Sequence, residues 1–194
     1  DYGFHSISIN PRWVALAAEE LHGSKVKVGG VVSLPLGADS TKMKVAQAKE
    51  SIFAGADEID MVVDLAAIIK GDSKYLSNQL RAVLGVCHSM RPKVSLKVII
   101  ESAALTREQK IFACRIADKC GVDFVKTSTG MNPAGGATIE DVKLMKEAAP
   151  NCKIKAAGGI RTAKQVLDML DAGAERIGTS SGVRIINELR AGQR

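Results

Sequence analysis

Short runs of β-branched residues alternate with longer amphipathic stretches along the whole of this 194-residue chain. This alternation is typical of βα units, in which parallel strands of one sheet are joined by helices. The amphipathic stretches 12–21, 41–54, 74–88, 107–119, 139–148, 163–171 and 182–189 are expected to be helices. The expected strands lie at 6–9, 25–32, 58–63, 94–100, 124–126, 153–156 and 176–178.

A three-residue motif recurs where three of these helices end. A glycine is followed two residues later by an acid in Gly55-Ala56-Asp57, Gly121-Val122-Asp123 and Gly173-Ala174-Glu175. The glycine suits the left-handed conformation that ends a helix, and the acid begins the next strand. Because no linker or low-complexity segment interrupts the repetition, we interpret residues 1–194 as a single (β/α) domain.

The number of units falls one short of a closed barrel. A (β/α)8 TIM barrel needs eight strands, and this chain supplies seven. Gly3 is placed like a glycine that ends a preceding helix. We therefore predict an α/β fold of the TIM-barrel type whose first βα unit is missing, preceded in the natural protein by roughly 25–45 further residues. The alternative is an open doubly wound sheet, but the chain contains no GxGxxG motif.

Composition excludes several classes of protein. No apolar run approaches the roughly 20 residues that a membrane-spanning helix needs, so no membrane partner is expected. The net charge of +6 suits an anionic ligand, but the basic residues are scattered and only 4% of residues are aromatic, which disfavours a nucleic-acid platform. Lys42, Lys44 and Lys49 are interpreted as a solvated helix face.

The cysteines and histidines give no sign of a metal site. Cys87, Cys114, Cys120 and Cys152 lack CxxC spacing, and the three histidines are isolated from one another. This usage favours reduced, mostly buried thiols in a cytoplasmic protein.

Two lysines each lie at the end of a short apolar strand, directly before a turn of small residues. Lys126 precedes the segment 127–130, and Lys155 precedes the segment 156–159. Burial and a second nearby ammonium both lower a lysine pKa, from about 10.4 towards roughly 7–8 at tuned sites. A partly neutral lysine can attack a carbonyl carbon and form a Schiff base. The pair predicts an enzyme with its active site at the carboxyl ends of the strands.

Further charged residues are expected to point into the barrel. Strand parity turns Asp60 inward, because the apolar residues on either side of it would pack under helices. The same parity turns Lys97 and Glu101 inward. Structural readings stay open, since a strand-end lysine can extend to solvent and Asp60 can serve only as the ion-pair partner of Lys97. Lys153, at the start of its strand, is interpreted as an ordinary solvated charge.

Two late segments have the form of phosphate-binding turns. Residues 157–162 and 178–182 each connect a strand to a helix, so backbone N–H groups and a helix N-terminus face one point. Turns need glycine in any case, but two such turns in consecutive late units match the usual phosphate site of these barrels. The residues expected to hold a phosphate are Gly158, Gly159, Arg161, Ser180 and Ser181.

These segments resemble, in order and through essentially the whole chain, the signature segments of the deoxyribose-phosphate aldolase family of class I aldolases. The resemblance implies a TIM barrel that reversibly cleaves the sugar phosphate 2-deoxy-D-ribose 5-phosphate to acetaldehyde and D-glyceraldehyde 3-phosphate without metal or cofactor. Lys126 matches the Schiff-base lysine, Lys155 the second active-site lysine and Asp60 the proton-shuttling aspartate. Lys97, Thr129 and Gly130 are added to the expected substrate contacts. The matching segments are 56–62, 96–101, 124–130, 155–161 and 178–182.

The chain departs from the family pattern in two places. It lacks the Asp-x-Thr segment that usually lines the substrate site from the first strand, which agrees with the missing unit. Residues 31–37 lack the Gly-Phe that often precedes the proline, so an aromatic wall of the pocket is expected to be altered.

Two alternatives to this function stay open. One is another Schiff-base or phosphate-binding barrel enzyme, such as a transaldolase. The other is a non-catalytic basic protein that binds nucleic acid. The sequence also leaves open whether the chain forms a dimer or a tetramer.

Overall fold

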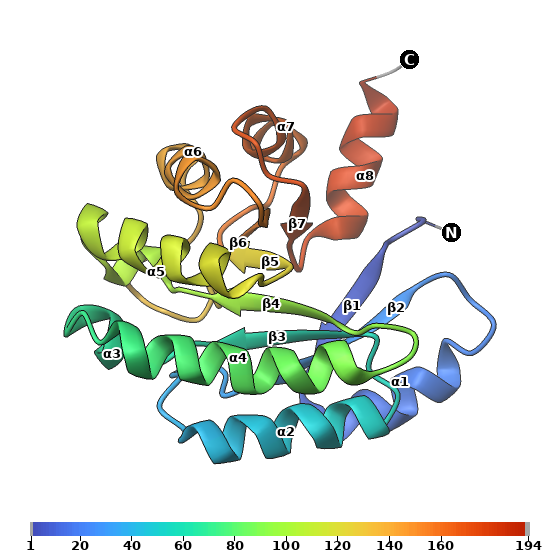
Figure 1. Cartoon of the computed structure of the whole chain (residues 1–194). Coiled ribbons are helices and arrows are strands. Elements are labelled where there is room, and N and C mark those ends of the chain that lie inside the picture. Colours follow the sequence, from blue (N-terminus) through green and yellow to red (C-terminus); the bar gives the residue numbers. More distant parts are fainter. Residues whose placement is uncertain (1, 193–194) are drawn as a thin grey trace.

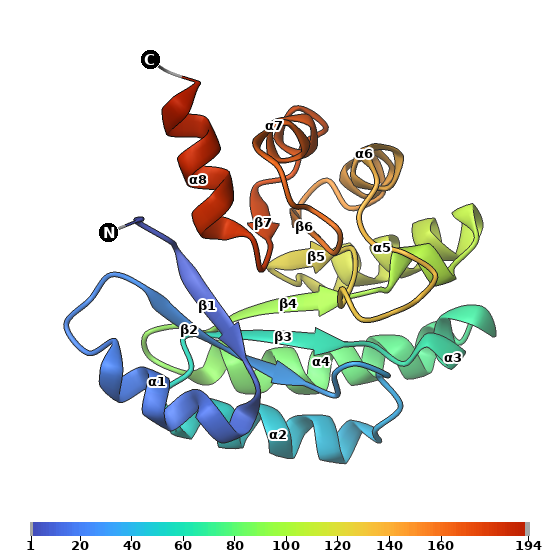
Figure 2. The same cartoon turned by 180° about the vertical axis from the view of Figure 1, so that it is seen from behind.

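Seven parallel strands form a single sheet in the computed structural model, which describes residues 2–192. The strands follow one another in chain order from β1 to β7, and the sheet curls with the helices on its convex side (Figures 1 and 2). The expected parallel α/β architecture is confirmed, and the strand ends lie within two residues of the expected ones. The strands are β1 (Ser6–Ile9), β2 (Lys27–Val32), β3 (Glu58–Val62), β4 (Ser95–Ile99), β5 (Phe124–Lys126), β6 (Lys153–Ala157) and β7 (Arg176–Gly178).

Among residues 2–192, no strand lies between β1 and β7, and these two strands do not pair with each other. The sheet is therefore a curled half-barrel of the TIM-barrel type rather than a closed ring. Both edge strands are only partly buried, whereas all five residues of β3 are buried.

The helices begin where the sequence provides capping side chains. The side chains of Thr106 and Thr138 accept hydrogen bonds from backbone N–H groups in the first turns of α5 and α6, and Pro11 begins η1. The short helix α3 was not expected, because five residues after the cap Asp64 are too few to show a helical period. The helices are η1 (Pro11–Trp13), α1 (Val14–Glu20), α2 (Thr41–Phe53), α3 (Leu65–Ile69), α4 (Ser73–Ser89), η2 (Ser102–Ala104), α5 (Arg107–Cys120), α6 (Ile139–Ala148), α7 (Ala163–Asp171) and α8 (Gly182–Ala191).

The repeated glycine–acid motif connects each helix to the sheet as expected. Gly55, Gly121 and Gly173 all have positive φ, which a residue with a Cβ adopts at a cost. The carboxylates of Asp57 and Asp123 then accept hydrogen bonds from backbone N–H groups at or beside the preceding strand. All three motifs therefore end a helix, and the carboxylates of Asp57 and Asp123 also fix the start of the next strand.

The interpretation of Lys44 as part of a solvated helix face is wrong. Its side chain is fully buried, and Nζ donates to Gly37 O at 2.7 Å, Val62 O at 2.8 Å and Gln79 Oε1 at 2.9 Å. These acceptors compensate the ammonium for its loss of water, which is why a lysine can occupy this position. Lys42 and Lys49 are exposed, as expected.

The register of the sheet brings residues that are distant in sequence together on its concave side. Asp60 lies beside Lys97 across β3 and β4, and Lys126 lies beside Lys155 across β5 and β6. The residues before and after Asp60 in β3, Ile59 and Met61, point to the opposite face of the sheet. Both are fully buried in the core under the helices. The parity expected for β3 is thus confirmed, and it directs Asp60 to the concave side.

Candidate active site

Asp60 lies at the centre of a cluster of lysines on the concave side of the sheet. Its Oδ2 accepts hydrogen bonds from Lys126 Nζ at 2.7 Å and from Lys155 Nζ at 2.6 Å. Its Oδ1 forms an ion pair with Lys97 Nζ at 3.0 Å. Asp60 is 0% exposed, and Lys126 and Lys155 are 6% and 5% exposed, so neither lysine extends into solvent. The reading of these lysines as solvated surface residues is thereby excluded.

Lys126 and Lys155 share one acceptor oxygen of Asp60, and this contact affects the pKa values of Asp60 and Lys155. Burial alone would raise the pKa of Asp60, but the ammonium groups of Lys126, Lys97 and Lys155 outweigh burial and hold that pKa well below its usual range. Burial lowers the pKa of Lys155 to about 8; the Asp60 carboxylate opposes this shift, and the ammonium groups of Lys126 and Lys97 add to it. The cluster therefore contains a carboxylate that stays ionised and an amine that loses its proton at about pH 8.

Lys97 lies beneath this pair rather than in contact with the cavity. Its side chain is fully buried between Asp60 and Glu58, with Nζ 2.8 Å from Glu58 Oε2. Glu58 in turn lies 3.4 Å from Arg176. A substrate in the cavity would meet Lys126 and Lys155 first, so the expected direct contact of Lys97 with substrate does not fit its position.

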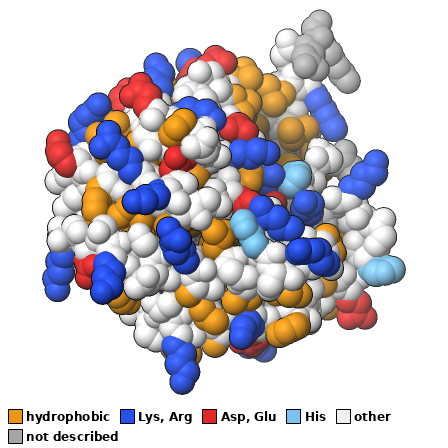
Figure 3. Space-filling view, in the orientation of Figure 1, with side chains coloured by type: hydrophobic (Ala, Val, Ile, Leu, Met, Phe, Trp, Pro, Cys, Tyr) orange, Lys and Arg blue, Asp and Glu red, His pale blue; other side chains and the backbone are white. Residues whose placement is uncertain are grey.

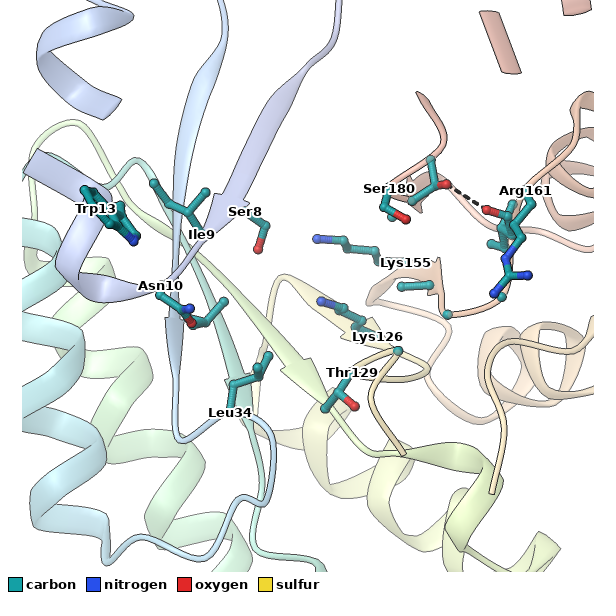
Figure 4. A pocket seen from close by; sticks show the side chains of 18 residues that line it. Ser8, Ile9, Asn10, Trp13, Leu34, Lys126, Thr129, Lys155, Arg161 and Ser180 are labelled. Carbon is teal, nitrogen blue, oxygen red and sulfur yellow. Dashed lines mark hydrogen bonds between the residues drawn. The ribbon is translucent and has the colours of Figure 1, made fainter. Parts of the chain in front are cut away.

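A cavity of about 670 Å3 opens above the lysine pair. Lys126 and Lys155 extend into it from β5 and β6 (Figure 4). Ser8 on β1, Trp13 and Leu34 lie across the cavity from the strands that carry these lysines. Leu34 stands in the loop where the sequence lacks the family's aromatic residue, so an aliphatic side chain lines this wall. The volume is that of a small-molecule site.

The expected glycine-rich turns form the rim of the same cavity. Gly130, Gly158 and Gly159 line it and all have positive φ. A Cβ on Gly158 would lie 3.0 Å from Gly136 Cα and 3.3 Å from Ser128 Cβ, so the close approach of these loops requires glycine. Bare backbone of this kind suits the oxygens of an anion.

The remaining expected contacts are divided between this cavity and a neighbouring hollow. Thr129, Arg161 and Ser180 line the cavity, although the Arg161 guanidinium lies apart from the amines of the lysine pair (Figure 4). Ser181 lines a separate hollow beside α8. The hydroxyl of Thr179 donates to Ile160 O at 2.7 Å and joins the two late turns.

Sequence reasoning missed the contribution of the first strand and its loop. Ser8, Ile9, Asn10 and Trp13 all line the cavity. The strand-end rule that identified Lys126 and Lys155 also applies to the carboxyl end of β1, so the signal was present. The sequence contains no motif there that distinguishes a binding residue from an ordinary turn.

On the face shown in Figure 3, charged side chains are found in several places rather than in a single patch. Lys and Arg side chains are spread across the face in Figure 3 and are mixed with acidic and uncharged ones. No helix in the part of the chain that the structure describes is both long and apolar enough to span a membrane. The four cysteines form no disulfide, and three of them are buried, as expected.

The curled parallel sheet and the lysine pair at the carboxyl ends of its strands define an α/β enzyme of the TIM-barrel type. The chain matches the family model described as DeoC/LacD family aldolase over residues 3–187. It is 50% identical over 192 residues to the deoxyribose-phosphate aldolase of Thermococcus gammatolerans, with 97% of this chain and 84% of that protein covered. It is 49% identical over 190 residues to the deoxyribose-phosphate aldolase of Dictyoglomus turgidum, with 97% and 84% covered.

A solved structure shows the same fold. The deoxyribose phosphate aldolase of Aeropyrum pernix, described as having a unique tetrameric structure, superimposes with a TM-score of 0.90 at 26% identity, covering 98% of this chain and 80% of that chain. The chain therefore belongs to the DeoC/LacD family of aldolases. The predictions of an enzyme and of an aldolase-type lyase are confirmed.

Proposed function

We propose that this chain reversibly cleaves 2-deoxy-D-ribose 5-phosphate to acetaldehyde and D-glyceraldehyde 3-phosphate through a Schiff base on Lys126. The observation that carries the proposal is the lysine pair on one oxygen of a buried aspartate, at the floor of a cavity rimmed by bare glycine backbone. The relatives at 49–50% identity carry the name deoxyribose-phosphate aldolase, which supports the choice of substrate.

The first step needs a neutral amine at Lys126. Because the pKa of Lys155 is lowered to about 8, part of the Lys155 population is free to take up a proton near neutral pH. Asp60 Oδ2 contacts both nitrogens and provides the route by which the proton of Lys126 passes to Lys155. Neutral Lys126 then attacks the aldehyde carbon C1 of the open-chain sugar, and loss of water gives an iminium.

The iminium is the electron sink for carbon–carbon cleavage. Removal of the proton from the C3 hydroxyl, through a water to the neutral Lys155 amine that Asp60 Oδ2 positions, lets the C2–C3 electron pair move into the iminium. D-glyceraldehyde 3-phosphate leaves with C3 as its aldehyde, and an enamine of two carbons stays on Lys126. Protonation of that enamine at C2 and hydrolysis of the resulting iminium release acetaldehyde and restore the lysine.

The glycine rim would hold the phosphate. Gly130, Gly158, Gly159 and Ser180 all line the cavity and would offer it backbone N–H or hydroxyl groups. A fixed phosphate would place C1 of the sugar beside Lys126, and such orientation supplies much of the rate of an aldolase step.

The proposal is tested by trapping the Schiff base. Borohydride reduction in the presence of acetaldehyde should leave a reduced two-carbon adduct, and peptide mass mapping should place it on Lys126. An adduct on Lys155 would reverse the roles of the two lysines. Absence of any adduct, together with absence of cleavage of 2-deoxy-D-ribose 5-phosphate, would exclude the proposed activity. Cleavage of a different sugar phosphate through an adduct on Lys126 would favour another Schiff-base aldolase or a transaldolase.

We also propose that the protein acts in the cytoplasm as a homo-oligomer. Support comes from the reduced cysteines and from the tetrameric description of the Aeropyrum pernix relative. Sedimentation at micromolar concentration should give a mass of at least two chains, and a mass of one chain would contradict the proposal.

A further inference from the structure

Glu101, at the carboxyl end of β4, has an unusual backbone conformation. Its φ is +54° and its ψ is +58°, in the left-handed region that a residue with a Cβ seldom adopts. The surroundings must hold such a conformation in place, and residues of this kind gather at functional sites. A glycine would adopt it without strain, so the side chain of Glu101 must provide something that glycine cannot.

The carboxylate of Glu101 is directed at a single neighbour. The residue is 1% exposed, and its two oxygens accept hydrogen bonds from Thr129: Oε1 from the backbone N–H at 3.1 Å and Oε2 from the hydroxyl at 2.6 Å. The Thr129 hydroxyl also accepts a hydrogen bond from Met131 N at 3.0 Å. Hydrogen bonds to an ionised acceptor are stronger than those between neutral groups, so this arrangement fixes both the backbone and the side chain of Thr129.

Further hydrogen bonds connect the same segment to both neighbouring strands. Ser102 N donates to Thr127 O at 2.8 Å on the β4 side. On the β6 side, Thr127 Oγ1 donates to Ala157 O at 2.9 Å and accepts from Ala157 N at 3.0 Å. The loop 127–130 that follows Lys126 is therefore held at its first residue by β4 and β6, and at Thr129 by Glu101.

We propose that Glu101 is a positioning residue of the active site, which holds the loop 127–130 so that Thr129 and Gly130 form the cavity wall on the phosphate side. Glu101 does not line the cavity, so it acts through Thr129, which does. Lys126 Nζ is anchored separately by Asp60 at 2.7 Å. Loss of the Glu101 carboxylate should therefore disturb the binding wall more than the reactive amine.

This inference rests on the proposed function, because it assigns the loop to the phosphate end of a sugar phosphate. The consequence is that loss of the Glu101 carboxylate should change KM more for the phosphorylated sugar than for the unphosphorylated one. For Glu101→Gln, KM for 2-deoxy-D-ribose 5-phosphate should rise about tenfold while kcat falls less than about threefold, since a hydrogen bond to a charged acceptor is lost. KM for unphosphorylated 2-deoxy-D-ribose should change less than about twofold, because that substrate does not use the phosphate wall.

Two further variants separate the carboxylate from the backbone strain. Glu101→Gly relieves the left-handed conformation, and Glu101→Asn tolerates it with a side chain too short to reach Thr129. Both should show the same rise in KM as Glu101→Gln. In the double variant Glu101→Gln/Thr129→Val, the rise in KM should be smaller than the product of the two single effects. Both changes remove the same interaction, between the Glu101 carboxylate and the Thr129 hydroxyl.

Hydrogen exchange at the Thr129 amide provides a readout that needs no substrate. Exchange at this amide should accelerate in all three Glu101 variants, while exchange at Ile99 in β4 stays as in the unmodified chain. An unmodified chain that cleaves the sugar phosphate, with unchanged KM and Thr129 exchange in the variants, would overturn the role of Glu101. An unmodified chain that shows no cleavage would overturn the proposed function and with it the phosphate assignment, while accelerated exchange at Thr129 alone would still support the fixing of the loop.

Discussion

Asp60 determines the arrangement of charge in this site. Three ammonium groups from three different strands lie within 3.0 Å of its two oxygens, and all four side chains are almost completely buried. Buried charges persist only when close partners replace the water that they lose. The carboxylate therefore orients the lysines, and it opposes the effect of burial on the pKa of Lys155.

Replacement of Lys155 tests the coupling between the two cavity lysines. Lys155→Leu should reduce kcat at least about 100-fold, because the proton acceptor beside Lys126 is lost. The part of the pH profile that follows the Lys155 pKa of about 8 should disappear from the residual activity, because that amine is no longer present. The measurement is the pH dependence of kcat.

A matched control lies two residues earlier on the same strand. Lys153 is exposed at the start of β6, and Lys153→Leu should leave both the rate and the pH profile of the enzyme close to those of the unmodified chain. A near-normal rate with an unchanged profile in Lys155→Leu would instead show that Lys155 takes no part in the reaction.

The sequence predicts this cluster well and the hydrogen bonds around it poorly. Strand parity and strand ends suffice for Asp60, Lys126 and Lys155, because the period of a strand fixes the side to which each residue points. The contact between Glu101 and Thr129 depends on the backbone turning into the left-handed region, and no local pattern signals that turn. A sequence places side chains on faces more reliably than it pairs their atoms.

At the scale of secondary-structure elements, Lys44 connects three segments, one of which is the loop that brings Leu34 to the cavity. From α2 it reaches the loop after β2 at Gly37, the end of β3 at Val62, and Gln79 on α4. Burial lowers the pKa of Lys44 to about 8, against the opposing effect of the Asp64 and Asp39 carboxylates. The loop that contains Leu34 is therefore held to the strand that contains Asp60.

Removal of this ammonium should destabilise the fold. Lys44→Met removes the Nζ donor from three acceptors, of which Gln79 Oε1 keeps a hydrogen bond from Asp64 N at 3.0 Å. Each buried acceptor left unpaired costs roughly 1–3 kcal/mol, so we expect a net loss of at least about 2 kcal/mol. Urea unfolding at pH 7 measures it, with Lys42→Met on the exposed side of α2 as the control. An equal midpoint for Lys44→Met and the unmodified chain would show that the acceptors find other partners.

The elements themselves were predictable to different degrees. Long amphipathic helices such as α4 and α5 were located within one or two residues, because their period repeats several times and capping residues bound them. The helix α3 escaped because it is shorter than two turns. The burial of Lys44 was not predicted, because a lysine in a helix is normally exposed to solvent. Its burial depends on acceptors that lie outside its own helix.

At the scale of the whole molecule, the two edge strands of the sheet differ from the central strands in their pairing and burial. β1 pairs only with β2 and β7 only with β6, so alternate backbone groups on their outer sides have no strand partner among the described residues. Unpaired edges are where a sheet opens most readily and where it associates with other chains.

Amide hydrogen exchange should reveal this gradient in stability. Amides of β1 and β7 should exchange at least about tenfold faster than those of β3 and β4, because local opening needs less free energy where one neighbour is absent and burial is partial. Exchange resolved by residue in the isolated chain measures it. Equal protection across all seven strands would show that both edges are covered, by another segment or by a second copy.

The order of the strands also determines when the site can form during synthesis. Each strand pairs with the one made just before it, so the sheet can grow as the chain emerges from the ribosome. Asp60 is 95 residues from Lys155, which at ~5–20 residues per second means a delay of roughly 5–20 seconds. During that interval Lys97 is the first cation to reach the carboxylate. Asp60 in the nascent protein is thus already paired with Lys97, and Lys126 and Lys155 come together only when β6 joins the sheet.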